Sequence, residues 1–340
     1  MSAHRRAAVM ADVARVAGVS AQTVSRVANG EMNVRAATRR RVVEAMREVG
    51  YRPNGAARAL KRGSFNTIGV ITFTLSTFGN SHTLDAVTTS LAKRGYSVKL
   101  ILSGEQTSSS VSGAYNRLAD EAVDGIIMLY EAGLLDHGEA LFPPGLPVLV
   151  IGSTRVDSLG MTVDVNQEQG ARLATQHLVG LGHRDIWHIA GPMNGFAARK
   201  REDTWRAVLS DNGLQSEGRS IPGDWTADSG YAAGLFLGDR DDVTAVFAAN
   251  DSIAIGLIRG LREQGKRVPD DISVVGFDDA PDSAFLWPPL TTVSQDFSMV
   301  GEVSSQLLLE AVRTGETPAA HSVLPTQLVV RQSTAPAPRR

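Results

Sequence analysis

From Thr67 onward, this chain of 340 residues alternates short runs of aliphatic and β-branched residues with longer stretches of helical periodicity. The alternation constrains the fold strongly, because parallel strands need long crossover connections, usually helices, which then cover both faces of the sheet. We interpret as strands residues 67–72, 97–102, 124–128, 147–151, 185–190, 245–248 and 272–277. The pattern predicts an α/β fold with doubly wound parallel sheets.

The strands are too many for one sheet of usual size, and residues 163–166 fall near the midpoint of the chain. We therefore expect two lobes. The N-lobe would comprise about 64–163 and 295–321, the C-lobe about 164–294 and 322–334, and a tail 335–340. A ligand would bind between the lobes, at the carboxyl ends of the strands.

The first 63 residues differ in charge from the remainder of the chain. They contain 13 Lys and Arg against 4 Asp and Glu, whereas the whole chain has a net charge of -2. A basic block is often a solvated tail, but regularly spaced apolar residues run through this one. A small folded module that binds polyanions is therefore the better interpretation.

Two short helices are predicted within this module. Residues 11–17 place Val13, Ala14 and Ala17 on one face, and Gly18 then permits the positive φ of a sharp turn. Ser20 has the side chain of an N-cap and begins a second helix, in which Val24 and Val27 face inward. Two helices joined by so short a turn form a helix-turn-helix, whose second helix enters the major groove.

The second helix carries the side chains expected to contact DNA. Ala21, Gln22 and Arg26 lie opposite the apolar face, and Arg and Gln have the donors and acceptors to pair with guanine and adenine. The residues expected to contact phosphates are Ser20, Thr23, Ser25, Asn29, Asn33 and Thr38. Such contacts position the protein without specifying sequence.

A third helix is expected at 36–49, with Val42, Met46 and Val49 as its buried stripe and Arg39, Arg40 and Arg41 in its first half. Cations near a helix N-terminus oppose the helix dipole, so a phosphate partner would relieve that repulsion. The alternative is a three-helix bundle with no nucleic-acid partner.

Residues 12–29, DVARVAGVSAQTVSRVAN, followed by GYRPN at 50–54, resemble the headpiece of the LacI/GalR family of bacterial repressors. The resemblance implies a headpiece at 1–51 and a hinge helix at 52–63 that forms when two subunits meet on the operator. In that hinge, Asn54, Ala57 and Leu60 would contact the minor groove, with Leu60 as an intercalating wedge. Val9 and Arg35 stand where the family usually has a capping Ser or Thr, so both helix starts should be less well capped.

Polar and aromatic residues follow several predicted strands. Arg201, Trp225, Asn250, Asp278 and Gln295 all lie near strand ends. Carboxylates and a guanidinium bind hydroxyls, and an indole covers the apolar face of a pyranose, so together they suit a polyhydroxylated ligand. Individually, each has a structural alternative: a helix cap, a turn former, a core residue or a surface ion pair.

The family resemblance continues to about Thr334 and implies a core like that of type I periplasmic binding proteins. By that resemblance, the effector cavity is lined by Phe73, Arg201, Trp225, Asn250, Asp278, Gln295 and Phe297. A member that the core especially resembles has an aspartate where this chain has Gly152 and an asparagine where it has Leu129. A different effector, or a weaker hold on one hydroxyl, is therefore expected. Ala21 likewise replaces an aromatic residue, so operator preference should differ.

Oligomeric state and compartment follow from simpler observations. That relative continues into a leucine-heptad helix that joins dimers into tetramers, whereas this sequence ends in APAPRR without apolar heptads, so we expect a homodimer. No run of residues is long and apolar enough for a membrane helix or a signal peptide, which predicts a cytoplasmic protein with no membrane partner.

The sequence offers little support for an enzyme. It has no cysteine, no phosphate-binding Gly-Lys-Ser/Thr loop, no Gly-x-Ser-x-Gly elbow and no His-Glu-x-x-His motif. We expect no cofactor, no metal and no catalytic residue. The sequence predicts a ligand-responsive repressor that binds a pseudo-palindromic double-stranded DNA operator and responds to a sugar or glycoside, as inducer or corepressor. The alternative is a sugar-binding or sugar-converting protein without a DNA function.

Overall fold

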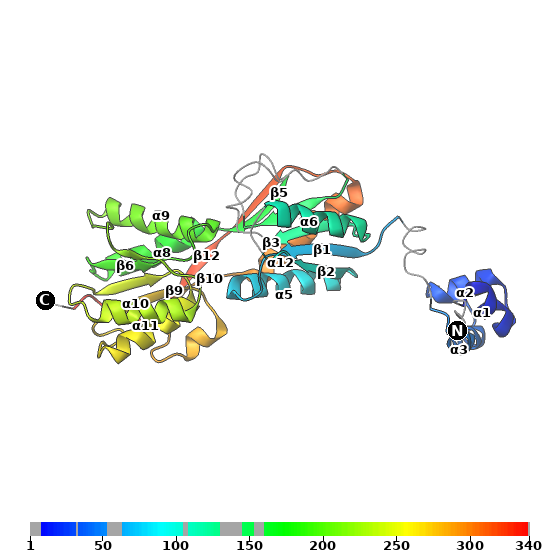
Figure 1. The fold of residues 1–340 in the computed structure, drawn as a ribbon, viewed down its shortest axis with the longest axis horizontal. Coiled ribbons are helices and arrows are strands. Elements are labelled where there is room, and N and C mark those ends of the chain that lie inside the picture. Colours follow the sequence, from blue (N-terminus) through cyan, green and yellow to red (C-terminus); the bar gives the residue numbers. More distant parts are fainter. Residues whose placement is uncertain are drawn as a thin grey trace, which may run out of the picture. The chain divides into compact units, whose positions relative to one another are not determined.

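The computed structural model describes residues 8–31, 33–52, 63–104, 108–129, 145–152 and 160–338. The chain divides into two units, residues 1–65 and 66–340 (Figure 1). The first unit is helical, and the second holds both sheets.

The first unit consists of α1 (Met10–Ala17), α2 (Ala21–Ala28) and α3 (Ala36–Val49). Its core is formed by the following buried side chains: Val13, Ala17, Val24, Val27, Val42 and Ala45. The buried stripe predicted for α3 was partly wrong, because Met46 and Val49 are only partly buried and Ala45 takes the inner position. A small side chain fits there because α1 packs closely against α3.

The turn between α1 and α2 forms as the sequence predicts. Gly18 has φ 62°, and the Ser20 hydroxyl accepts a hydrogen bond from the Thr23 backbone N–H at 3.2 Å. Val9 has no capping side chain, but the Asp12 carboxylate accepts from the Val9 N–H at 3.0 Å. Arg35 leaves the start of α3 without a side-chain cap. Both helix starts therefore lack a side-chain cap at the expected position, and at α1 the Asp12 hydrogen bond partly compensates for it.

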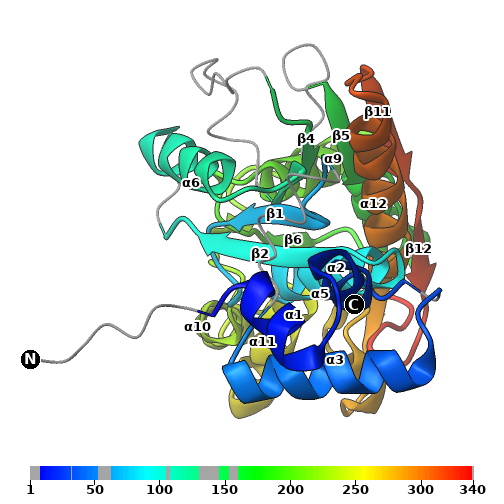
Figure 2. The same ribbon diagram turned by 90° about the vertical axis from the view of Figure 1, so that its right-hand side faces the viewer.

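The N-lobe of the second unit is built on a six-stranded sheet of order β11-β5-β4-β3-β1-β2, with every neighbouring pair parallel. Its strands are β1 (Thr67–Thr72), β2 (Ser97–Leu102), β3 (Gly125–Leu129), β4 (Val148–Ile151), β5 (Met161–Val165) and β11 (Ala320–Leu324). The helix α6 (Ser108–Asp120) packs on one face, and α5 (Phe78–Lys93) and α12 (Phe297–Thr314) pack on the other (Figure 2).

The C-lobe has a second six-stranded sheet, of order β12-β10-β9-β8-β6-β7. Its strands are β6 (Ile186–Ile189), β7 (Ser220–Ile221), β8 (Ala245–Ala248), β9 (Ser273–Asp278), β10 (Thr291–Gln295) and β12 (Thr326–Val329). The edge strand β12 runs antiparallel to β10, whereas the other neighbouring pairs of this sheet are parallel, as predicted. The direction of β12 reverses because it follows β11 from the other lobe almost directly.

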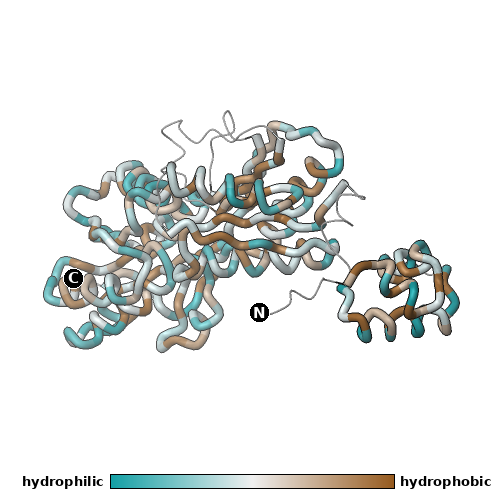
Figure 3. Tube along the Cα trace, turned by 45° about the vertical axis from the view of Figure 1, so that its right-hand side comes forward, coloured by the Kyte–Doolittle hydropathy of each residue, from teal (hydrophilic) through white to brown (hydrophobic). Residues whose placement is uncertain are grey.

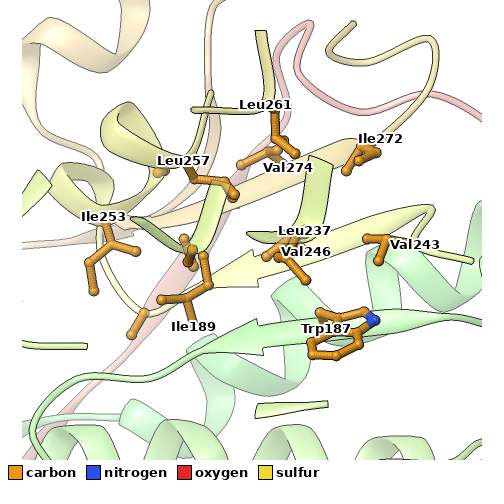
Figure 4. Close-up of a cluster of buried hydrophobic side chains, with 14 of the residues drawn as sticks. Trp187, Ile189, Leu237, Val243, Val246, Ile253, Leu257, Leu261, Ile272 and Val274 are labelled. Carbon is orange, nitrogen blue, oxygen red and sulfur yellow. The ribbon is translucent and has the colours of Figure 1, made fainter. Parts of the chain in front are cut away.

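Two helix pairs cover the C-lobe sheet. On one face lie α8 (Gln167–Gly180) and α9 (Phe196–Asp211). On the other lie α10 (Ala227–Gly238) and α11 (Asp251–Glu263), whose Leu237 and Leu257 pack with Val246 and Trp187 of the sheet (Figure 4). Apolar residues concentrate along the strands of both lobes (Figure 3), as expected for sheets covered on both faces.

Among the described elements, the chain crosses between the lobes after β5, after β10 and after β11. The first two crossovers end in helix caps: Asn166 accepts from Gln169 N–H at 2.9 Å, and Asp296 from Met299 N–H at 2.8 Å. Helices α8 and α12 therefore begin where the lobes meet, beside the carboxyl ends of the strands. No helix among the described residues is long and apolar enough to cross a bilayer.

Helices α10 and α11 approach so closely that their glycines leave no space for a methyl group. A Cβ on Gly256 would lie 1.8 Å from the carbonyl oxygen of Ala227, whereas one on the exposed Gly113 of α6 would meet no atom within 4 Å. We expect Gly256→Ala to lower the free energy of unfolding by about 1–3 kcal/mol or more, because the helices must separate. The matched change Gly113→Ala should raise it by up to about 1 kcal/mol. Urea denaturation followed by tryptophan fluorescence measures both, and equal effects would contradict this account of the packing.

Candidate functional site

A cavity lies between the two lobes, where β3, β4 and β5 of one sheet and β9 and β10 of the other end. It contains about 770 Å³ of empty space, part of it open to solvent. Six of the seven residues expected from the sequence line it: Arg201, Trp225, Asn250, Asp278, Gln295 and Phe297.

The seventh residue, Phe73, is not among those lining the cavity. It directly follows β1, and the wall beyond that strand is formed instead by Thr77, Asn80 and Thr83 around the start of α5. The assignment of Phe73 to the effector site therefore stays a prediction.

Arg201 is almost fully enclosed in the cavity wall, with 4% of its surface exposed. Its Nε donates to Gln167 Oε1 at 2.9 Å, and its Nη1 donates to the carbonyl oxygen of Ala249. Its Nη2 lies 3.8 Å from Asp278 Oδ1, and its guanidinium carbon lies 3.6 Å from the ring centroid of Phe277. These contacts fix the guanidinium plane before any ligand arrives.

Asp278 is the last residue of β9 and has φ 113°, a conformation that L-residues rarely adopt. Gln295 Nε2 donates to its Oδ1 at 2.6 Å. Burial raises the pKa of Asp278 to about 7; the charge of Arg201 lowers this pKa, that of Asp251 raises it, and the Gln295 hydrogen bond lowers it. Strained backbone and a perturbed carboxyl in one cavity are typical of a ligand site.

Trp225 and Asn250 are held together. Asn250 caps α11 by accepting from the Ile253 N–H at 2.8 Å, and its Nδ2 donates to the carbonyl oxygen of Trp225 at 3.1 Å. Trp225 has φ 70°, and its ring centroid lies 5.4 Å from the Arg201 guanidinium carbon. Asn250 is thus a helix cap, as its structural alternative proposed, and it also lines the cavity.

A second hydrogen-bond network, centred on Asp251 outside the cavity lining, supports the backbone at Asp278. The buried carboxylate of Asp251 accepts from the Ala280 N–H and the Ser283 hydroxyl, both at 2.7 Å, and from the Thr292 hydroxyl at 2.5 Å. Burial raises the pKa of Asp251 to about 6, and these three hydrogen bonds oppose the rise. The network ties the segment after β9 to β10 and so restrains the backbone that positions Asp278.

The sequence did not identify Asp164 as a cavity residue, although it lines the N-lobe wall with 5% exposure. Its Oδ1 accepts from the Val165 N–H at 2.7 Å. Burial raises the pKa of Asp164 to about 7; hydrogen bonds from Val165 and Gln167 and the charges of Arg201 and Lys200 oppose the rise. The only sequence signal was a carboxylate inside an otherwise apolar strand.

In the first unit, α2 presents the side chains expected to contact bases. Ala21, Gln22 and Arg26 are exposed, whereas Val24 and Val27 on the opposite face are buried. Arg26 Nε lies 3.9 Å from Glu31 Oε2, with nearly half of each side chain exposed. Such an exposed pair contributes little to stability, so the guanidinium is available to a stronger partner.

The residues expected to contact phosphates surround that surface. Ser20 and Asn33 are exposed, and Thr23, Ser25, Asn29 and Thr38 are partly exposed. Ser20 and Thr23 are hydrogen-bonded to each other, as are Ser25 and Asn29. The hinge positions Asn54, Ala57 and Leu60 lie outside the described residues.

In the part of the chain that the structure describes, no group of three His, Cys, Asp or Glu side chains is arranged to hold a metal. The cavity combines fixed hydrogen-bonding groups, the two buried carboxyls of Asp164 and Asp278, and the aromatic faces of Trp225 and Phe297. That arrangement can bind a neutral molecule rich in hydroxyl groups.

Comparison with known proteins identifies both units. Residues 9–54 match the family model of bacterial regulatory proteins of the lacI family, and residues 175–334 match that of a periplasmic binding protein-like domain. The lactose operon repressor of Escherichia coli (strain K12) is 36% identical over 95% of this chain and 89% of its own length. The chain belongs to the LacI family. The regulator CelR of Thermobifida fusca, 35% identical over 97% of this chain and 99% of its own length, is a further relative.

Solved structures of LacI-family proteins share the fold of this LacI-family chain. The lac repressor dimer bound to operator and the anti-inducer ONPF matches with TM-score 0.85 and 34% identity, over 97% of this chain and 100% of that one. A complex of CelR with cellobiose matches with TM-score 0.67 and 32% identity, over 96% and 99%. These relatives are a repressor and a transcriptional regulator.

The raised pKa of Asp164 predicts how pH affects the stability of this LacI-family protein. The ordinary aspartate pKa is 3.8 and the folded value is about 7, so between these values the folded protein keeps a proton that the unfolded chain releases. Stability therefore falls as pH rises through this interval, by up to about 4 kcal/mol from this group. We expect Asp164→Asn to remove that part of the fall and to melt above the wild type at pH 8. Melting curves at pH 5 and pH 8 test this, and a variant less stable at both would contradict it.

Proposed function

We propose that this protein is a dimeric, cytoplasmic transcriptional repressor that binds a pseudo-palindromic operator and is released by a sugar or glycoside. The observation that carries the proposal is the cavity, whose walls come from both lobes and which contains a fixed guanidinium, carboxyls and an indole. A ligand that contacts both walls changes the preferred orientation of the lobes.

The coupling to DNA follows from the order of the chain. The first strand of the N-lobe begins at Thr67, shortly after the expected hinge at 52–63, which itself follows the headpiece. A change in lobe orientation in a dimer therefore alters the distance between the two hinges. An effector that prefers the separated state shifts operator affinity by a coupling of about 1–3 kcal/mol.

The proposed cavity residues are Arg201, Trp225, Asn250, Asp278, Gln295 and Phe297. The proposed base contacts are Gln22 and Arg26, with Ala21 against a thymine methyl or the groove wall. The lac repressor dimer was solved bound to operator, and CelR was solved with cellobiose. Both precedents support a DNA-binding dimer with a sugar effector.

DNA binding is tested by selecting duplexes from a palindromic library with the full chain and titrating the selected duplex with salt. We expect log K to fall steeply with log salt, because phosphate neutralisation releases counterions. Arg26→Ala should reduce discrimination at one base position by about 1–3 kcal/mol. The control Arg267→Ala, on the exposed surface of the C-lobe, should change neither. A protein that selects no duplex at low salt would contradict the repressor function and favour a sugar-binding protein without a DNA role.

Effector release is tested with Arg201→Lys, which keeps the charge but loses the planar fork. We expect operator affinity to remain and release of the selected duplex by sugars to be lost at concentrations that release the wild type. Arg199→Lys on the same helix, where the guanidinium donates to the carbonyl oxygen of Asn194, is the matched control. Tighter operator binding on addition of sugar would identify a corepressor, and normal release of the Arg201→Lys complex would exclude Arg201 from the effector site.

A further inference from the structure

The N-lobe wall of the cavity contains a single ionisable side chain among its described residues. Leu129, Ile151 and Val165 present apolar groups to the cavity, and Gly152 presents no side chain. Asp164 is therefore the one charged group on this side, whereas the C-lobe wall carries both Arg201 and Asp278.

Asp164 differs from the other buried carboxylates in its partners. Asp278 has Arg201 and Gln295, and Asp251 has three hydrogen-bond donors. Among the described residues, Asp164 receives hydrogen bonds from Val165 N–H and the Gln167 side chain, and the nearby cations Arg201 and Lys200 lie beyond ion-pair distance. A carboxylate has about four acceptor positions, so this group keeps unfilled acceptor capacity at the cavity wall.

Such an arrangement destabilises the ligand-free protein, because burying a charge without a full set of partners is unfavourable. Packing does not require a carboxylate at this point of β5, because the residues directly before and after it, Val163 and Val165, are buried and apolar. A ligand that donates hydrogen bonds would supply the missing partners. The position of the group thus points to a function in binding.

We propose that Asp164 binds the effector from the N-lobe wall, opposite Asp278 on the C-lobe wall, and that the effector is an uncharged carbohydrate whose hydroxyls donate to both carboxylates. This inference rests on the proposed function of the cavity. At pH 8, where both carboxyls are ionised, they outnumber the guanidinium among the cavity-lining residues, and this repels phosphorylated and acidic sugars. Asp164 would supply a polar contact on a wall where Leu129, Ile151 and Gly152 supply none.

Gln167 connects this contact to the C-lobe. Its side chain hydrogen-bonds to Asp164, and its Oε1 accepts from Arg201 Nε at 2.9 Å. Since α8 begins at Gln167, directly after the crossover from β5, a ligand held by Asp164 is linked through one side chain to the guanidinium of the other lobe. The contact therefore joins the two lobes through the ligand and through Gln167.

The test uses the full-length protein and three neutral probes, cellobiose, o-nitrophenyl galactoside and ribose, together with ribose 5-phosphate. We expect the wild type to bind at least one neutral probe and not the phosphate. Asp164→Asn and Asp164→Ala should bind that probe about 10- to 100-fold more weakly, as expected for loss of a hydrogen bond to a charged group. Asp203→Asn, which removes the same charge from an exposed position of α9, should bind it like the wild type.

The measurements are isothermal titration calorimetry and melting temperature without ligand at pH 8. The expected result is opposite signs: Asp164→Asn melts higher than the wild type and binds the probe more weakly. A merely structural residue would move stability and affinity down together. Equal affinity of the wild type and Asp164→Asn for the probe would overturn the inference and leave the proposed function standing. A wild type that binds no neutral probe would refute both the proposal that the cavity binds a sugar and this inference. Preferential binding of ribose 5-phosphate would overturn the uncharged class.

Discussion

A buried guanidinium organises the cavity between the lobes. Arg201 lies on the ring of Phe277, which packs against Phe247, and Phe247 in turn stacks on His188 with ring centroids 4.8 Å apart. Burial lowers the pKa of His188 to about 4, so this ring stays neutral near neutral pH and adds no second charge beneath the arginine. The stacked rings of Phe277, Phe247 and His188 support one face of the guanidinium. Its N–H donors can therefore bind a ligand without reorganisation.

Burial raises the pKa values of three carboxyls at or near the cavity, Asp164, Asp251 and Asp278. Asp251 does not line the cavity, and three hydrogen bonds within the fold oppose the cost of its burial. Asp164 and Asp278 line the cavity, where a ligand can donate to them. Binding sites commonly keep such unfavourable groups where a ligand can satisfy them.

Much of the fold could be predicted from the sequence because its signals are local. The apolar runs at 67–72, 97–102 and 245–248 are the strands β1, β2 and β8, and the turn chemistry of Gly18 and Ser20 forms as expected. The cavity residues Arg201, Trp225, Asn250, Asp278, Gln295 and Phe297 were identified because strand ends converge at one edge of a parallel sheet and because the chain resembles a known family. Phe73 was assigned by resemblance alone, and it is not among the residues that line the cavity.

The sequence by itself therefore determined the type and order of the elements, the basic headpiece and the kinds of side chain at the strand ends. These features depend on periodicity, capping and charge, which involve neighbours along the chain. Tertiary structure alone decided that β12 is antiparallel, that Ala45 fills the headpiece core and that Asp164 lines the cavity. Each of these depends on contacts between segments far apart in sequence. The partners of Arg201 come from α8, from the end of β8 and from β9, and only the tertiary packing of the C-lobe brings them together.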